Sequence, residues 1–258
     1  MTELVVLSHL RWTFVWQRPQ QLVSRLAADF ERTWFVEEPV AVEGLTEAVL
    51  RVEPHGQVNR VWLEVPAEVD VLGFGPATSN WYEQELGRLL GDQEDRTVWL
   101  YTPMALDLAQ SLQPALLVYD VMGDLAAFKS APAGVVLRQR QALQEADVVF
   151  TGGRSLHRSV ADRRPSDVHC FRSGVEPEHY ATAVDLRDDR RTERRPVAGY
   201  VGVIDERIDL DIVGGLAAAL PDWDIDMVGP VMKIDPAAPS GTQHHLPRPL
   251  ASTASCRR

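Results

Sequence analysis

Hydrophobic residues along the chain recur in short continuous runs separated by polar segments. Examples are Leu4–Leu7, Val98–Tyr101 and Val148–Phe150, which are rich in β-branched and aromatic residues. Continuous apolar runs of this length are typical of strands that are buried on both faces. We expect further strands at residues 34–36, 61–63, 116–119, 168–171, 197–201 and 225–228.

Helix-length segments separate several of these runs. After Pro19, which suits the first turn of a helix, apolar residues follow the three-and-four spacing of an amphipathic helix as far as Phe30. A second helix is predicted from about Leu210 to Leu220. Alternating strands and helices predict an α/β protein with a doubly wound, parallel, Rossmann-like sheet. Ligands of such sheets bind beyond the carboxyl ends of the strands.

A charged segment divides the chain. Residues 185–196 are nearly all charged and end at Pro196, so we interpret them as a linker. Residues 1–184 are then one complete Rossmann-like domain. The strand and helix pattern restarts after the linker and stops at Pro236, which predicts an incomplete second domain at residues 197–236. A length of 258 residues, long for one domain and short for two, agrees with this division.

Charge and cysteine content exclude several classes of protein. The chain has 26 basic and 37 acidic residues, a net charge of −11, which argues against nucleic acid as a partner. Two cysteines are too few for a disulfide framework or a thiolate metal site, and they favour a reducing cytoplasm. Neither a signal peptide nor a transmembrane segment is visible. We expect a cytoplasmic protein; peripheral contact with the inner face of the membrane would suit a lipid-linked acceptor, although no basic amphipathic helix indicates it.

The segment after the first strand concentrates residues that suit a sugar or a phosphate. Indole rings and planar donors are available at Trp12, Trp16 and Arg11, and His9 follows the strand directly. We regard His9 as a candidate catalytic residue and the other three as candidate substrate-binding residues. The alternative is a capping loop packed into the core, an interpretation that we favour for the two tryptophans.

Two carboxylates follow the strand at residues 116–119. Asp120 and Asp124 could bind substrate hydroxyls, or act as a general base if burial raises the pKa. Aspartate is also a common N-cap of a helix. We expect Asp120 to face the ligand as a candidate catalytic residue. Asp124 is a candidate substrate-binding residue that would also cap a helix containing Phe128.

A glycine pair follows the strand that ends at Phe150. Gly152 and Gly153 open a predicted helix, and their backbone amides could receive an anion from the substrate. A tight turn with Ser155 as the helix cap is the interpretation that we favour.

A similar turn occurs in the second domain. Gly202 and Arg207 follow a strand and come before a helix, where they could stabilise a departing diphosphate. An ion pair of Arg207 with Asp205 or Asp209 is an equally good interpretation. Asp-x-Asp pairs nearby are uninformative in so acidic a chain, and we assign no metal site.

Several spaced segments together resemble bacterial glycosyltransferases of the family 1/family 4 type, which have the GT-B fold. These segments are Ser8–Trp12, Gln17–Gln20, Tyr119–Phe128, Thr151–Leu156 and Gly202–Arg207. The resemblance covers about residues 4–236. It implies two facing Rossmann-like domains, the first for the acceptor and the second for the nucleotide-sugar donor.

The resemblance also implies an activity. Such an enzyme transfers a hexose from a nucleoside diphosphate sugar, here UDP- rather than GDP-, to a hydroxyl of a saccharide or lipid-linked acceptor. The transfer would be retaining and would need no metal or other cofactor. By position, Gly202 and Arg207 match the donor-phosphate turn of the family, although Val203 stands where many relatives have a second cation. Gly123 and Asp124 stand where relatives often have Asp-Glu.

The later half of the donor domain, including the Glu-x7-Glu segment of such enzymes, does not follow in this chain. We interpret residues 237–258, which lack acidic residues, as a frameshifted or disordered tail. Reread one base later, residues 242–250 permit Pro-Asn-Ile-Thr-Cys-Leu-Gly-Arg, which is similar to the next strand of the family. We therefore expect a truncated enzyme with impaired activity. The alternative is a non-catalytic product that binds a saccharide or a partner protein through the loop of Trp12 and Trp16.

Overall fold

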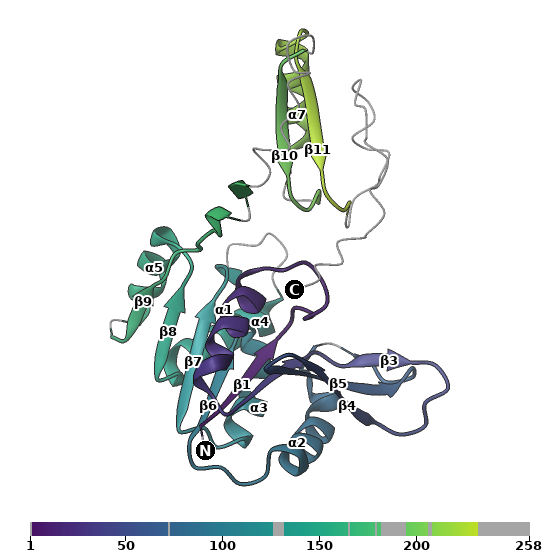
Figure 1. Ribbon diagram of the computed structural model, residues 1–258, viewed down its shortest axis with the longest axis vertical. Helices are drawn as coiled ribbons and strands as arrows, with labels where there is room; N and C mark the ends of the chain where they lie inside the picture. Colours follow the sequence, from purple (N-terminus) through teal and green to yellow (C-terminus); the bar gives the residue numbers. More distant parts are fainter. Residues whose placement is uncertain are drawn as a thin grey trace. The chain divides into compact units, whose positions relative to one another are not determined.

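The chain divides into two compact units, Met1–Val175 and Glu176–Arg258, which are considered separately (Figure 1). The computed structural model describes residues 2–71, 73–125, 132–164, 166–178, 180–181, 195–205 and 208–231. Most of the predicted linker and all of the predicted tail lie outside the described residues.

The first unit is built on one nine-stranded, mostly parallel sheet. Its strands are β1 (Glu3–Ser8), β2 (Arg32–Glu37), β3 (Val40–Val42), β4 (Val49–His55), β5 (Val58–Pro66), β6 (Arg96–Leu100), β7 (Leu116–Val121), β8 (Val148–Thr151) and β9 (Val168–Cys170). Their order is β3-β5-β2-β1-β6-β7-β8-β9, with β4 paired to β5. All of these pairs are parallel except β4 with β5, which confirms the predicted doubly wound α/β sheet.

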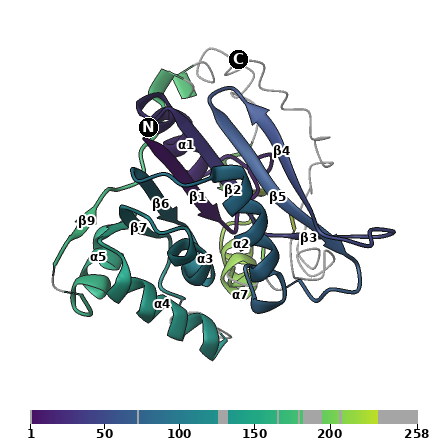
Figure 2. The ribbon, with the colours of Figure 1, turned by 90° about the horizontal axis from the view of Figure 1, so that it is seen from below.

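Helices cover both faces of this sheet (Figure 2). They are α1 (Arg18–Leu26), α2 (Pro76–Leu90), α3 (Leu106–Ser111), α4 (Ala133–Glu145) and α5 (Arg154–Ala161), with 3-10 turns at Ala27–Asp29 and Pro103–Ala105. In Figure 2, α1 lies on one face and α2 to α5 lie on the other. The helix predicted as far as Phe30 is shorter, because the chain turns after Leu26 and Phe30 has an extended backbone with φ −117°.

The alternation of side chains along β1 explains the two core layers. Leu4 and Val6 pack on the α1 side, whereas Val5 and Leu7 pack on the side of the other helices. All four side chains are completely buried. A strand covered on both faces needs apolar residues at every position, which is why the continuous runs identified these strands.

The described part of the second unit contains a β-α-β element. Strand β10 (Val197–Val201) pairs in parallel with β11 (Asp224–Val228), and helix α7 (Leu210–Ala219) connects them. The predicted restart of the strand and helix pattern at these residues is confirmed. Asp209 caps the helix, because its Oδ1 accepts the amide hydrogens of Asp211 and Ile212 at 3.1 and 3.2 Å. No residue of α7 is buried.

Candidate functional site

The carboxyl edge of the first sheet contains its topological switch point. From β1 the chain proceeds to β2 and β5 on one side, and it returns to β6 on the other side of β1. Open α/β sheets bind their ligands at such a reversal of strand order. His9 follows β1 directly and Tyr101 follows β6 directly, so the two residues flank the switch point.

His9 is exposed at this edge. Its pKa is lowered because neighbouring protein atoms partly desolvate the ring, and the backbone of Tyr101 opposes this effect by hydrogen bonding. The turn that carries His9 is held by the Ser8 hydroxyl, which accepts the Leu10 amide hydrogen at 3.0 Å. His9 is therefore a neutral imidazole at neutral pH, placed in reach of solvent.

Asp120, the second predicted catalytic residue, is completely buried in β7. Arg18 donates from Nε to both carboxylate oxygens, at 2.9 and 3.2 Å, and from Nη1 to the carbonyl of Phe171 at 2.8 Å. The Tyr101 hydroxyl lies beside the same carboxylate but lacks the geometry of a full hydrogen bond. Burial raises the pKa of Asp120, and Arg18 opposes the rise. A substrate hydroxyl therefore reaches Asp120 only if these neighbours move.

Arg18 was not among the predicted site residues. It is the first residue of α1, and its side chain is only 11% exposed. Its partner Asp120 lies 102 positions later in the sequence. The only local indication of a role for Arg18 was its position beside an aromatic loop, and that position does not indicate which carboxylate Arg18 pairs with.

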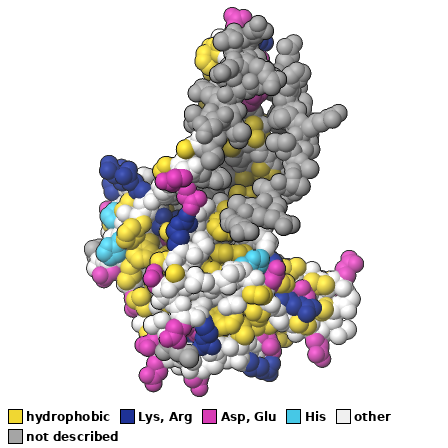
Figure 3. All heavy atoms as spheres, in the orientation of Figure 1, with side chains coloured by type: hydrophobic (Ala, Val, Ile, Leu, Met, Phe, Trp, Pro, Cys, Tyr) yellow, Lys and Arg dark blue, Asp and Glu magenta, His cyan; other side chains and the backbone are white. Residues whose placement is uncertain are grey.

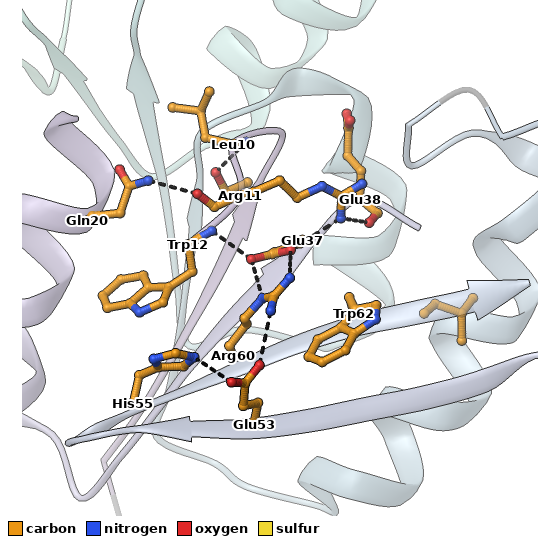
Figure 4. Close-up of polar contacts among 12 residues, drawn as sticks. Leu10, Arg11, Trp12, Gln20, Glu37, Glu38, Glu53, His55, Arg60 and Trp62 are labelled. Atoms are coloured by element: carbon orange, nitrogen blue, oxygen red, sulfur yellow. Dashed lines mark hydrogen bonds and ion pairs between the residues drawn. The ribbon is translucent and has the colours of Figure 1, made fainter. Parts of the chain in front are cut away.

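Arg11 takes part in a polar network at the end of β2 (Figure 4). Its Nη1 is 3.3 Å from Oε2 of the buried Glu37 and also donates to the carbonyl of Glu38, while Nη2 donates to the carbonyl of Pro39 at 3.1 Å. Glu37 also accepts the Trp12 amide hydrogen at 2.7 Å. In this arrangement Arg11 ties the loop after β1 to β2, and both of its terminal nitrogens are engaged.

The same network continues onto β4 and β5. Arg60 donates to both oxygens of Glu37, at 2.8 and 3.1 Å, and to Glu53 at 3.0 Å. Its guanidinium carbon lies 4.2 Å from the ring centroid of Trp62, a cation–π contact. Figure 4 shows Arg60 between the two carboxylates. Sequence analysis did not identify this network, because it joins residues of three separate strands.

The two tryptophans of the loop after β1 lie in different environments. Trp12 is buried against Phe35, with ring centroids 5.0 Å apart, so the core-packing interpretation is confirmed for Trp12. The ring centroid of Trp16 lies 5.6 Å from that of Trp12, but Trp16 is half exposed, so the core-packing interpretation is wrong for Trp16. Of this predicted substrate-binding pair, only Trp16 is accessible to a ligand.

Asp124 and the glycine pair lie around α5. The carboxylate of Asp124 accepts a hydrogen bond from the Ser159 hydroxyl at 3.0 Å and pairs with Arg163 at 3.3 Å. The helix expected to contain Phe128 lies outside the described residues. Figure 3 shows basic side chains gathered over α5.

The glycine pair itself ends β8. Gly153 is the N-cap of α5, and α5 has no side-chain cap, so the expected cap by Ser155 is wrong: Ser155 lies inside the first turn. Gly152 and Gly153 leave open space where a side chain would be. The first amides of α5 therefore have no side-chain cap.

The glycine turn of the second unit packs closely on the strand end beside it. The amide of Gly202 donates to the carbonyl of Val228 at 2.9 Å. Gly229 has φ +150°, and a Cβ there would collide with the carbonyl oxygen of Gly202. Only glycine fits at Gly229, because it tolerates both the backbone angle and the close approach. Arg207 lies outside the described residues, so neither its donor-phosphate role nor its ion pairs are tested.

In the described part of the chain, no three His, Cys, Asp or Glu side chains converge in a group that could hold a metal ion. No helix in these segments is both long and apolar enough to cross a membrane.

Comparison with known structures identifies the fold. OtsA in its apo form matches with a TM-score of 0.61 and 11% identity, over 91% of this chain and 66% of that one. An E. coli trehalose-6-phosphate structure bound with UDP-2-fluoro glucose matches with a TM-score of 0.57 and 11% identity, over 90% and 65%. An α,α-trehalose-phosphate synthase (UDP-forming) from Burkholderia xenovorans, in complex with glucose-6-phosphate, matches with a TM-score of 0.53 and 12% identity, over 92% and 68%.

These structures are GT-B glycosyltransferases, so the expected GT-B fold is confirmed. The chain spans between 65 and 68% of their length. No protein-family model matches the sequence, and no curated protein matches it significantly.

Proposed function

We propose that this chain is the acceptor-side domain and part of the donor-side domain of a glycosyltransferase. It would move a hexose from a UDP-sugar to a hydroxyl of a saccharide or lipid-linked acceptor. The observation that supports this most strongly is a GT-B fold shared with trehalose-phosphate synthases, one of which is UDP-forming. The sequence resemblance supports a retaining transfer without a metal.

His9 is the residue that we propose to contact the acceptor. It is exposed at the switch point, and its lowered pKa keeps the imidazole neutral at neutral pH. A neutral imidazole can accept a hydrogen bond on one nitrogen and donate from the other. It can therefore orient a sugar hydroxyl, or take its proton as the new glycosidic bond forms.

Asp120 acts differently within this proposal. Because it is buried and paired with Arg18, its first role is to hold the start of α1 against β7 and the end of β9. Direct contact with substrate, as expected from the sequence, would require Arg18 to swing away. Gly152 and Gly153, which follow the neighbouring strand β8, would lie beside the bound acceptor.

The donor would bind to the second unit. Gly202 and Arg207 would hold the diphosphate, because fixed positive charge stabilises the negative charge that develops as the sugar departs. The close backbone contact of Gly202 and Gly229 keeps this turn in shape.

Calorimetry with UDP-glucose and GDP-glucose tests the proposed function. We expect UDP-glucose to bind, and Arg207→Ala to weaken this binding about tenfold through loss of a charge-assisted hydrogen bond. Arg88→Ala, which removes an exposed arginine of α2, is the control and should change nothing. No binding of either nucleotide sugar, or equal binding by Arg207→Ala, would contradict donor use and favour a non-catalytic binder.

A further inference from the structure

Three consecutive apolar side chains are exposed in the loop between β1 and α1. Phe14, Val15 and Trp16 are 56, 49 and 52% exposed, and we call these three residues the aromatic tip. An exposed run of three large apolar residues weakens solubility and is retained where it serves a function. The aromatic tip follows His9 in the loop that starts at the switch point.

The backbone of the aromatic tip is fixed by hydrogen bonds. The buried Gln20 donates from Nε2 to the carbonyls of Arg11 and Val15, at 3.0 and 3.3 Å, and its Oε1 accepts the Gln17 amide hydrogen at 3.1 Å. The amide of Phe14 donates to the carbonyl of Arg11 at 3.2 Å. A loop that is already ordered loses little conformational entropy when a ligand binds.

The surroundings of the aromatic tip do not favour an anionic ligand. Residues 12–17 carry no charged side chain. The flanking Arg11 and Arg18 are paired with Glu37 and Asp120, and these carboxylates offset their positive charge. The net charge of −11 adds a general repulsion of anionic surfaces. An uncharged apolar group is the ligand that this surface complements.

We propose that the aromatic tip binds an uncharged alkyl or aryl group of an amphiphilic acceptor, whose hydroxyl-bearing end reaches His9. The identification of the ligand as an acceptor rests on the proposed glycosyl transfer. The existence of an apolar binding surface does not depend on that proposal. Phe14 and Trp16 would cover the apolar group, because aromatic side chains bury a large area with few rotatable bonds.

Calorimetry with octyl glucoside below its micelle concentration, against methyl glucoside, tests this proposal on the 258-residue chain. We expect octyl glucoside to bind at least about tenfold more tightly than methyl glucoside. Phe14→Ser should weaken the binding of octyl glucoside about tenfold, because it removes one aromatic side chain that would bury apolar surface of the ligand. Trp16→Ser should act in the same direction. Leu137→Ser is the matched control, because Leu137 is an equally exposed apolar residue of α4.

Circular dichroism of each variant verifies that the fold is retained. Equal affinity for the two glucosides, or equal loss in the Leu137→Ser control, would overturn the proposal. Binding to phosphatidylcholine vesicles that Phe14→Ser abolishes, without binding of octyl glucoside, would also overturn it and assign the aromatic tip to a lipid surface. If octyl glucoside binds as expected while UDP-glucose does not bind, the proposed function fails and the apolar site stands.

Discussion

Replacing Arg18 with methionine is expected to destabilise the first unit. Arg18 is the partner of Asp120, which is completely buried, and it also donates to the carbonyl of Phe171. Methionine keeps most of the side-chain length and removes the charge and the donors. The variant therefore leaves a buried carboxylate without its counter-charge.

The magnitude follows from the burial of both partners. Removing one partner of a buried ion pair costs about 3–5 kcal/mol. Because 11% of the Arg18 side chain is exposed, we expect a loss near the lower end, about 3 kcal/mol. The double variant Arg18→Met with Asp120→Asn removes both charges and should recover most of the loss, since no buried charge then remains.

The loss should also depend on pH. Burial raises the pKa of Asp120 above 3.8 and Arg18 opposes the rise, so removing Arg18 raises this pKa further. A raised pKa means that the folded form binds more protons than the unfolded form, and stability falls as pH rises through the interval between the two values. The interval between the unfolded and folded pKa values of Asp120 is wider in Arg18→Met than in the parent chain. The variant's loss of unfolding free energy should therefore be smaller at pH 5 than at pH 8.

Urea unfolding followed by tryptophan fluorescence measures this free energy of unfolding. Six of the seven tryptophans lie in Met1–Val175, so the signal reports the first unit. Arg25→Met, at an exposed position of the same helix, is the control and should cost less than about 1 kcal/mol. A deficit below about 1 kcal/mol for Arg18→Met, equal at pH 5 and pH 8, would refute this account of the pair.

Three further changes test other parts of the structure. Glu37→Gln removes the buried carboxylate that pairs with Arg60 and Arg11, leaving Arg60 with Glu53 alone, and should cost about 2–3 kcal/mol in urea unfolding; a loss under 0.5 kcal/mol, about the scale of a surface change, would contradict this. Gly229→Ala should speed up hydrogen exchange of the Gly202 amide, which donates to Val228, because the added methyl collides with the Gly202 carbonyl; an unchanged exchange rate would show that the turn adapts. Asp209→Ala should weaken the protection of α7 amides by about 1 kcal/mol, and no change would mean that the N-cap is dispensable.

Sequence patterns predicted the strands that are covered on both faces but missed β3 (Val40–Val42) and β4 (Val49–His55). The residues of β4 are only partly buried, so they form no continuous apolar run. The cap of α5 was also assigned wrongly to Ser155, because serine is a common N-cap, whereas the helix already begins at Arg154 with Gly153 as its N-cap.

The roles of the site residues depended on pairing at long range. The placement of His9 at the carboxyl end of β1 was predicted because a position directly after a strand is a local property of the sequence. Arg11 was expected to face a ligand, whereas its terminal nitrogens bind Glu37 and the carbonyls that follow β2. Trp12 and Trp16 lie four residues apart in the same loop, yet of the two only Trp12 is buried.

The sequence by itself determined the fold class, the restart of the pattern at β10, and the edge of the sheet at which the candidate site residues of the first unit lie. These properties follow from local hydrophobic period and from strand direction. Only the tertiary structure decided that Arg18 neutralises Asp120 and that Glu37 anchors the loop after β1. The physical reason is strand order: it brings together residues that are 102 and 25 positions apart, and no local pattern specifies which strands become neighbours.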